Sequence, residues 1–191
     1  MARILILNWS IYGQTAKICR RLQEILRGRG HDVEVIPLPE FDGDLPGYDA
    51  IFIGASIRNG KHNPAVLDFI RGHQQILESK PSGFFSVSLV ARKPGKDTAG
   101  TNPYMKAFLA KCPWKPDLSE VFGGDLDYQR YSVMDRNIIR FIMWITKGPT
   151  DPQTKAEYTD WDKVERFAGR MSDLAAGPTR TADASETAQA G

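Results

Sequence analysis

Short apolar runs alternate along this chain with segments whose apolar residues recur every three or four positions. Residues 3–7 are almost continuously apolar, as expected of a strand that is covered on both faces. Four apolar residues then follow at helical spacing: Ile18, Leu22, Ile25 and Leu26. Gly28 or Gly30 is expected to end this helix. The start of the chain therefore predicts one β-α unit.

The same alternation continues through the rest of the chain. Apolar runs predict further strands at residues 32–38, 50–55, 84–90 and 118–126. Helical spacing predicts a helix that Asn63 caps and that includes Leu77, and a short helix over residues 104–111. A last helix is expected to have Thr159 as its cap.

Strands that alternate with helices imply a parallel sheet with helices on both faces. Five strands suit the order 2-1-3-4-5, so we expect a doubly wound α/β fold. One domain over residues 1–176 is expected, with an inserted segment over residues 127–150. Residues 177–191 are small and polar and predict a disordered tail. In such sheets the ligand crevice lies beyond the carboxyl ends of the strands.

The junction between the first strand and the first helix combines hydroxyl groups with a glycine. It comprises Ser10, Ile11, Tyr12, Gly13, Gln14 and Thr15. A turn here directs backbone N–H groups to one point, where the helix dipole also favours an anion. Ser10 and Thr15 add hydroxyl donors, and Gly13 lets the backbone close around a bound group. We interpret the junction as a phosphate cradle, and an ordinary β-α turn with Ser/Thr capping is the alternative.

Composition and charge narrow the class of protein. The 191 residues include 25 Lys and Arg against 23 Asp and Glu, so net charge makes no case for nucleic acid binding. Cys19 and Cys112 form no metal-binding pattern, and we expect two buried thiols in a reducing compartment. No metal cluster or catalytic triad emerges. A strand pattern so near the N-terminus leaves no room for a signal peptide, which predicts a cytoplasmic protein.

The junction and three longer stretches carry a resemblance to a known family. Ser10-x-x-Gly13-x-Thr15 resembles the FMN-phosphate loop of flavodoxins, although Asn8 stands where that pattern usually has an aromatic residue. The longer stretches are IGASIRNGKHN at residues 53–63, FFSVSLVARKPGKDT at residues 84–98 and YTDWDKVERFA at residues 158–168. Over about residues 3–171 the chain resembles the flavodoxin-type, quinone-dependent protoporphyrinogen oxidases of bacterial haem synthesis.

This resemblance implies a flavodoxin-like fold that holds FMN, oxidises protoporphyrinogen IX to protoporphyrin IX and passes electrons to a membrane quinone. Two loops would sandwich the flavin ring, through Ser56, Ile57, Arg58, Asn59, Gly60, Ser88, Leu89, Val90 and Ala91. Arg58 would stabilise negative charge on the reduced ring, or form a surface ion pair instead. His62 is a candidate to take a proton. Arg92 and Lys93 are candidates to bind substrate propionates, or merely solvate a loop.

An additional amphipathic helix is predicted over residues 133–147. One face carries Met134, Ile138, Phe141, Ile142 and Ile145. Arg136, Arg140 and Lys147 fall on the other face, with Trp144 near the boundary. Anionic headgroups attract a basic side and acyl chains receive an apolar one, so the helix suits a membrane surface, although packing on its own core is the alternative. We therefore expect peripheral attachment to the inner face of the cell membrane through Arg136, Arg140, Phe141, Trp144 and Lys147.

Two other functions are compatible with such a fold. A soluble flavodoxin-type electron carrier is expected to show a strongly acidic surface, and a sequence pI near 8.5 speaks against it. An NAD(P)H-quinone reductase shares the fold, but the additional basic helix gives no reason to expect nicotinamide binding. The quinone-dependent oxidase is therefore the interpretation that the sequence favours.

Overall fold

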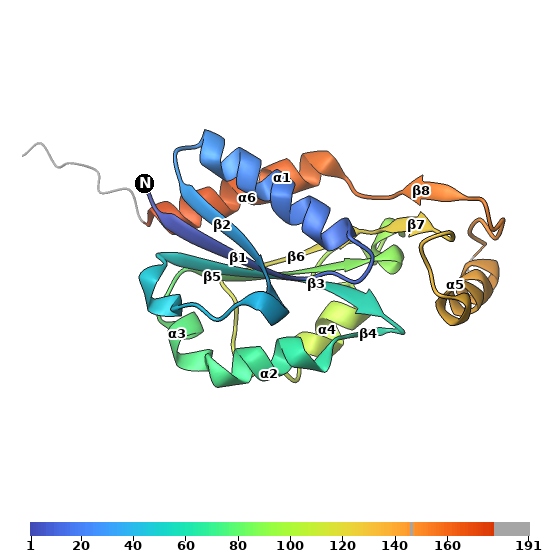
Figure 1. Ribbon diagram of the computed structural model, residues 1–191, viewed down its shortest axis with the longest axis horizontal. Helices are drawn as coiled ribbons and strands as arrows, with labels where there is room; N and C mark the ends of the chain where they lie inside the picture. Colours follow the sequence, from blue (N-terminus) through green and yellow to red (C-terminus); the bar gives the residue numbers. More distant parts are fainter. Residues whose placement is uncertain (146, 178–191) are drawn as a thin grey trace, which may run out of the picture.

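A central parallel sheet organises the chain, of which the computed structural model describes residues 1–145 and 147–177 (Figure 1). Within these residues the parallel strands are β1 (Arg3–Trp9), β2 (Asp32–Pro37), β3 (Ala50–Arg58), β5 (Ser82–Ser88) and β6 (Leu118–Gly123). They lie in the order β2-β1-β3-β5-β6, and the short β4 (Lys61–His62) pairs antiparallel with the end of β3. Counted along the chain without β4, this is the predicted order 2-1-3-4-5, and the fold class is confirmed.

Helices cover both faces of this sheet. The helices are α1 (Gln14–Gly28) and α6 (Trp161–Ala176) on one face, and α2 (Pro64–Gly72), α3 (Gln74–Glu78) and α4 (Pro103–Leu109) on the other (Figure 1). Successive residues of a strand point to opposite faces. Ile4 and Ile6 therefore pack toward α1 and α6, whereas Leu5 and Leu7 pack toward α2 and α4. All four side chains are fully buried, which explains the apolar run.

The helix predicted from Asn63 through Leu77 is divided in two. Asn63 caps α2 as predicted, because its side-chain oxygen accepts a hydrogen bond from the backbone N–H of Ala65 at 2.9 Å. After Gly72 the backbone of His73 leaves the helical region, with φ −123° and ψ 19°. α3 is therefore a separate helix, and the prediction of one continuous helix is wrong.

The cap of α6 is Asp160 and not Thr159, so that prediction is also wrong. The Asp160 carboxylate accepts a hydrogen bond from the backbone N–H of Lys163 at 3.0 Å. The Thr159 hydroxyl points elsewhere and donates to the carbonyl oxygen of Gly123 at 2.7 Å. Thr159 thus fastens the chain to the end of β6 and has no side chain left for capping.

The fourth predicted strand, residues 84–90, is shifted toward its N-terminus in the structure. β5 begins at Ser82, whose hydroxyl donates to the carbonyl of Leu77 at 2.9 Å and accepts from Trp114 Nε1 at 3.2 Å. These bonds let a polar residue lie inside the core. The strand then ends where the 3₁₀ turn η3 (Leu89–Arg92) begins. That turn carries the loop residues away from the sheet.

The remaining sequence predictions concern a short helix, the two cysteines and the C-terminal tail. The short helix expected over residues 104–111 is α4, displaced by one to two residues. Further 3₁₀ turns, η1 (Leu38–Glu40) and η2 (Leu45–Gly47), lie in the connection between β2 and β3. Cys19 is buried as predicted, whereas Cys112 is only half-buried. Apart from Gly177, the tail predicted over residues 177–191 lies outside the described residues.

The fifth predicted strand, residues 118–126, is interrupted at Gly123. A Cβ atom on Gly123 would lie 2.1 Å from the carbonyl oxygen of Tyr158, because two segments cross here. β7 (Asp125–Asp127) then leaves the main sheet and pairs antiparallel with β8 (Lys155–Glu157). The segment between β7 and β8 contains α5 (Val133–Ile145), which lies at the end of the molecule toward which the parallel strands point (Figure 1).

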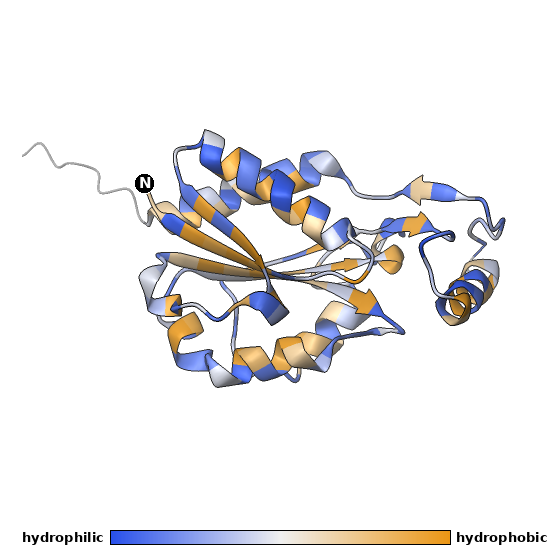
Figure 2. Cartoon of the chain, viewed as in Figure 1, coloured by the Kyte–Doolittle hydropathy of each residue, from blue (hydrophilic) through white to orange (hydrophobic). Residues whose placement is uncertain are grey.

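α5 turns most of its apolar residues outward and its arginines toward the protein, while Met143 is buried. Arg136 Nε donates to the carbonyl of Tyr128 at 2.9 Å, and Arg140 Nε donates to the carbonyl of Thr150 at 3.0 Å. The exposed large apolar residues are Val133, Met134, Ile138, Phe141, Ile142, Trp144 and Ile145. Figure 2 shows the resulting mixture of hydrophobic and hydrophilic residues on this helix. Both arginines, which the sequence analysis assigned to a membrane surface, are thus engaged by backbone carbonyls of the protein itself. In the described part of the chain, every helix is too short or too polar to cross a membrane.

Candidate functional site

A pocket lies where the carboxyl ends of the parallel strands meet α5. It brings together the three loops that the sequence predicts for a cofactor, through Ser10, Ile11, Tyr12, Gln14, Thr15, Ser56, Ile57, Arg58, Asn59, Gly60, Ser88, Leu89 and Val90. Gly13 and Ala91, which were also predicted, are not part of the pocket wall. Gly13 shapes the loop behind it, and Ala91 is buried in the core beneath it. The pocket therefore occupies the crevice expected for this sheet topology.

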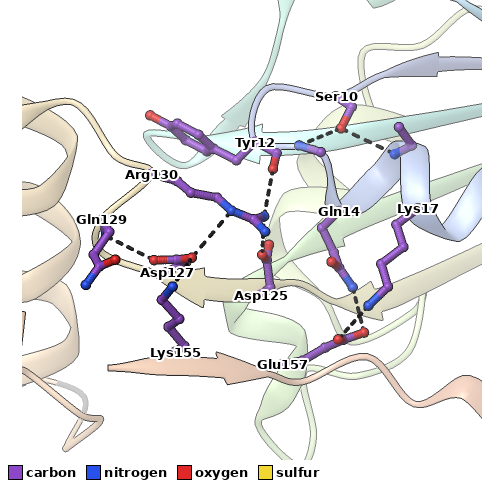
Figure 3. Close-up of polar contacts among 12 residues, drawn as sticks. Ser10, Tyr12, Gln14, Lys17, Asp125, Asp127, Gln129, Arg130, Lys155 and Glu157 are labelled. Atoms are coloured by element: carbon purple, nitrogen blue, oxygen red, sulfur yellow. Dashed lines mark hydrogen bonds and ion pairs between the residues drawn. The ribbon is translucent and has the colours of Figure 1, made fainter. Parts of the chain in front are cut away.

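The first of these loops owes its shape to a glycine and a serine. Gly13 has φ +95°, a left-handed conformation that side-chain-bearing residues rarely adopt. Ser10 Oγ accepts hydrogen bonds from the backbone N–H of Gly13 at 3.2 Å and of Ala16 at 3.3 Å (Figure 3). These contacts draw the loop into a tight curve at the N-terminus of α1, where unpaired N–H groups and the helix dipole favour an anion.

Two buried hydroxyl groups at the pocket lack a hydrogen-bond partner within the described residues. They are Thr15 Oγ1, in the first turn of α1, and Ser88 Oγ, at the end of β5. A buried polar group without a partner costs about 1–3 kcal/mol, so such groups call for an explanation. Both residues belong to the wall of the pocket. The two hydroxyls and the start of α1 thus fit a ligand that combines a phosphate with further hydrogen-bonding groups, as FMN does.

Side chains of the first loop are fastened to β8 and its continuation. Gln14 Nε2 donates to Glu157 Oε1 at 3.0 Å and to Thr159 Oγ1 at 2.8 Å. Lys17 Nζ forms an ion pair with Glu157 at 2.7 Å (Figure 3). The amide of Gln14 and the ammonium of Lys17 are therefore committed to protein partners, which leaves the backbone and Thr15 to contact an anion.

A second set of contacts joins this loop to β7. Arg130 Nη1 donates to the carbonyl of Tyr12 at 3.3 Å and to Asp125 Oδ2 at 3.1 Å. Its Nε forms an ion pair with Asp127 at 3.4 Å, and Lys155 lies 3.7 Å from the same carboxylate (Figure 3). The β7–β8 ribbon thus holds the first loop from behind, so that the inserted segment helps to shape the pocket.

Arg58 forms an ion pair, but its partner is a buried carboxylate at the pocket. Arg58 Nη2 lies 2.8 Å from Asp135 Oδ2, and Arg58 Nε donates to Asp135 Oδ1 at 3.3 Å. The Tyr12 hydroxyl donates to Asp135 as well. This hydrogen bond and the charge of Arg58 outweigh burial and lower the pKa of Asp135, which is therefore ionised at neutral pH. Burial and the same hydrogen bond raise the pKa of Tyr12, so its hydroxyl keeps its proton.

His62 lies outside the pocket wall and is buried between aromatic rings. Its Nε2 lies 2.9 Å from Ser86 Oγ, and its ring centroid is 4.6 Å from that of Phe108 and 5.4 Å from that of Phe84. Burial lowers the pKa of His62 to about 4. A neutral imidazole enclosed in this way is a core residue, and its placement argues against the proton-accepting role that the sequence suggested.

The burial of His62 predicts a specific dependence of stability on pH. Between pH 6.5 and 4 the folded protein keeps His62 neutral while the unfolded chain protonates it, so stability falls as the pH falls. The parent should lose about 3 kcal/mol more unfolding free energy over this interval than His62→Gln, measured by urea denaturation at a series of pH values. The exposed His73→Gln variant serves as the control and should follow the parent. Equal pH profiles for His62→Gln and the parent would contradict this assignment.

The edge of the pocket near η3 is positively charged. Arg92 and Lys93 both line it, as the sequence prediction requires. Arg92 also donates to the carbonyl of Leu89 at 2.7 Å and lies over the ring of Tyr158, 5.6 Å from its centroid. Burial and the neighbouring charges of Arg92 and Lys96 lower the pKa of Lys93. These cations are placed to attract a carboxylate at the pocket edge.

Sequence reasoning missed several residues of the pocket wall. Tyr104 comes from the start of α4, and Tyr131 from the chain just before α5. α5 itself adds Asp135, Ile138, Ile139, Ile142 and Met143. Ile138 and Ile142 were predicted on an outward apolar face, and they stand at the edge where that face meets the pocket. An acidic residue among the arginines of a basic helix is the signal that could have singled out Asp135.

The chain is similar to flavodoxin-domain proteins and to curated enzymes. Residues 5–153 match the flavodoxin domain. The protoporphyrinogen IX dehydrogenase [quinone] of Escherichia coli K12 is 40% identical over 178 residues, which cover 93% of this chain and 98% of that protein. The protein of the same name from Leishmania major is 46% identical over 134 residues, which cover 70% of this chain and 57% of that protein.

Solved flavodoxin structures share the fold of this chain. Oxidised flavodoxin 1 from Bacillus cereus has a TM-score of 0.51 at 18% identity, over 88% of this chain and 96% of that one. A flavodoxin from the domain Archaea has a TM-score of 0.50 at 12% identity, over 91% of this chain and 99% of that one. At such low identity the likeness concerns the fold alone.

Proposed function

Because the chain belongs to the flavodoxin-domain family of quinone-linked protoporphyrinogen IX dehydrogenases, we propose that it oxidises protoporphyrinogen IX with FMN as cofactor and a quinone as acceptor. One observation of the structure carries this proposal. The two buried hydroxyls without partners among the described residues, of Thr15 and Ser88, lie in a single pocket at the carboxyl ends of the strands. A bound cofactor would place the negative charge of its phosphate at the start of α1 and would give both hydroxyls a hydrogen-bond partner.

The residues around the pocket bind and orient the cofactor. The N–H groups at the start of α1 and the Thr15 hydroxyl would hold the phosphate, and the Ser88 hydroxyl would donate to another polar group of the cofactor. Bound FMN supplies the redox chemistry, as a group that accepts two electrons at a time. The side chains of Ile57, Leu89 and Tyr104 line the wall and exclude water from the reacting groups.

The wall of the pocket combines basic and apolar side chains, as an amphipathic substrate requires. Arg92 and Lys93 lie at one edge, where their charges attract the propionates of a porphyrinogen. Beyond Asp135, α5 contributes the apolar side chains of Ile138, Ile139 and Ile142, which are available to contact the macrocycle. A macrocycle that carries carboxylates and is otherwise largely apolar matches this combination.

The outer side of α5 supports contact with a membrane surface that holds the quinone. Met134, Phe141 and Trp144 are each at least 60% exposed, an unusual state for large apolar side chains on one short helix. Acyl chains would cover them, and the exposed Lys147 would face anionic headgroups. Because the same helix forms a wall of the pocket, a quinone dissolved in the bilayer would reach the flavin from this side.

The reaction itself is tested by anaerobic mixing of the FMN-loaded protein with protoporphyrinogen IX while porphyrin fluorescence is followed. Without quinone, fluorescence should stop at about one third of a porphyrin per FMN, because the oxidation removes six electrons and FMN accepts two. Adding a quinone should restart the rise in porphyrin fluorescence, which should then continue until substrate or quinone is exhausted. Absence of porphyrin under both conditions, with rapid oxidation of NADPH instead, would favour the reductase alternative.

A further inference from the structure

Asp135 is the point at which three separate parts of the chain meet. It is the only acidic residue of α5, and its side chain is 3% exposed. Tyr12 reaches it from the loop after β1, and Arg58 reaches it from the end of β3. The backbone N–H of Asp135 donates to Ser132 Oγ at 3.2 Å, which fixes the first turn of α5. The carboxylate therefore points away from its own helix and toward the pocket.

These contacts give Asp135 two separate effects on the pocket. The first is mechanical, because hydrogen bonds from Tyr12 and Arg58 hold the first turn of α5 against the cofactor loops. The second is electrostatic, because the Arg58 guanidinium faces an ionised carboxylate at 2.8 Å and the pair is neutral as a whole. Arg58 is half-exposed, whereas Asp135 is buried, so the uncompensated charge of either one would act on the pocket directly.

We infer that Asp135 is a positioning residue that docks α5 on the cofactor pocket through Tyr12 and sets the charge beside bound FMN by neutralising Arg58. The inference rests on the FMN-binding part of the proposed function and does not depend on which substrate donates the electrons. In this arrangement the two roles considered for Arg58, an ion pair and a charge beside the reduced flavin, belong to one cluster. α5 then influences the redox potential of bound FMN as well as forming part of the pocket wall.

Opposite shifts in redox potential test the electrostatic effect. Asp135→Asn leaves Arg58 uncompensated, so the two-electron midpoint potential of bound FMN should become more positive, because a cation favours the reduced, more negative cofactor. Arg58→Ala leaves Asp135 uncompensated and should make the potential more negative. The double variant should return close to the parent. Shifts in the same direction, or no shift in either single variant, would overturn the electrostatic assignment.

Control variants separate charge from shape and docking. Glu34→Gln removes a carboxylate that likewise accepts hydrogen bonds from an arginine, Arg3, and a tyrosine, Tyr48, but lies outside the pocket wall, and it should leave the potential unchanged. Tyr12→Phe keeps both charges and removes only the hydroxyl, so it should leave the potential near that of the parent. Amide hydrogen exchange in α5 should nevertheless rise in Tyr12→Phe and in Asp135→Asn, measured with and without FMN. Unchanged exchange in both would overturn the docking role, whereas failure of the parent to bind FMN would contradict the proposed function instead.

Discussion

Gly13→Val is expected to abolish FMN retention while the protein still folds. The residue at position 13 has φ +95°, and no atom lies within 4 Å of an added Cβ, so the penalty is backbone strain alone. Such strain costs about 1–3 kcal/mol and is relieved when the loop rearranges, which turns its N–H groups away from the phosphate. Thr15→Ala should weaken binding roughly ten- to hundred-fold, because a hydrogen bond to a charged group contributes about 1.5–3 kcal/mol. Both effects are measured by titration of FMN fluorescence.

The chain offers a matched control for this experiment. Gly30 has φ +86°, also has no atom within 4 Å of an added Cβ, and lies at the opposite end of α1. Gly30→Val should therefore lower the melting temperature about as much as Gly13→Val while FMN affinity stays that of the parent. Equal FMN affinity in the parent, Gly13→Val and Thr15→Ala, or recovery of stoichiometric FAD from the parent, would contradict a phosphate site at this loop.

The order of the strands could be predicted because it depends on local patterns. The apolar run of β1 and the helical spacing of α1 are visible within the first thirty residues, and parallel connectivity leaves few arrangements. Where a predicted strand boundary was wrong, a contact between residues far apart in the sequence determines where the strand begins or ends. Ser82 starts β5 because Trp114 and Leu77 satisfy its hydroxyl, and Gly123 ends β6 because Tyr158 crosses it. Neither contact has a signal in the neighbouring sequence.

The candidate site likewise has one part that the sequence could predict and one part that depends on contacts between distant residues. The loops after β1, β3 and β5 meet because the carboxyl ends of parallel strands lie at one edge of the sheet, which topology alone dictates. The partner of Arg58 could not be found in this way. Asp135 lies 77 residues further along the chain, in a segment whose amphipathic pattern predicts a helix but not its orientation. Hydrogen bonds from Arg136 and Arg140 to backbone carbonyls decided that orientation.

That orientation changes how membrane attachment should be tested. Exchanging Arg136, Arg140 and Lys147 for glutamate would remove two hydrogen bonds that hold α5 and so disturb the fold together with any surface charge. Lys147→Glu leaves these bonds intact. It should weaken binding to anionic vesicles at least fivefold, since one basic residue near the surface contributes about 1 kcal/mol and the new carboxylate adds repulsion, and added salt should reduce the difference.

The larger effect is expected from the outward apolar residues of α5. Met134→Gln, Phe141→Gln and Trp144→Gln combined should weaken vesicle binding by roughly a thousand-fold, because a large apolar side chain contributes about 1.5–3 kcal/mol on full burial and these three are buried in part. Glutamine preserves helix propensity. Turnover with a membrane-embedded quinone should then fall by a similar factor, measured beside turnover with a water-soluble analogue, which should stay that of the parent.

Ile138 provides the matched comparison, because it lies on the same helix but lines the pocket. Ile138→Gln should lower turnover with both quinones and leave vesicle binding nearly unchanged, since the pocket side of α5 faces the substrate. Unchanged vesicle binding in the triple variant would contradict membrane contact through this face. Equal loss of both activities in the triple variant, with FMN retained, would instead assign Met134, Phe141 and Trp144 to the reaction pocket. The two sides of one helix thus separate delivery of the quinone from the chemistry at the cofactor.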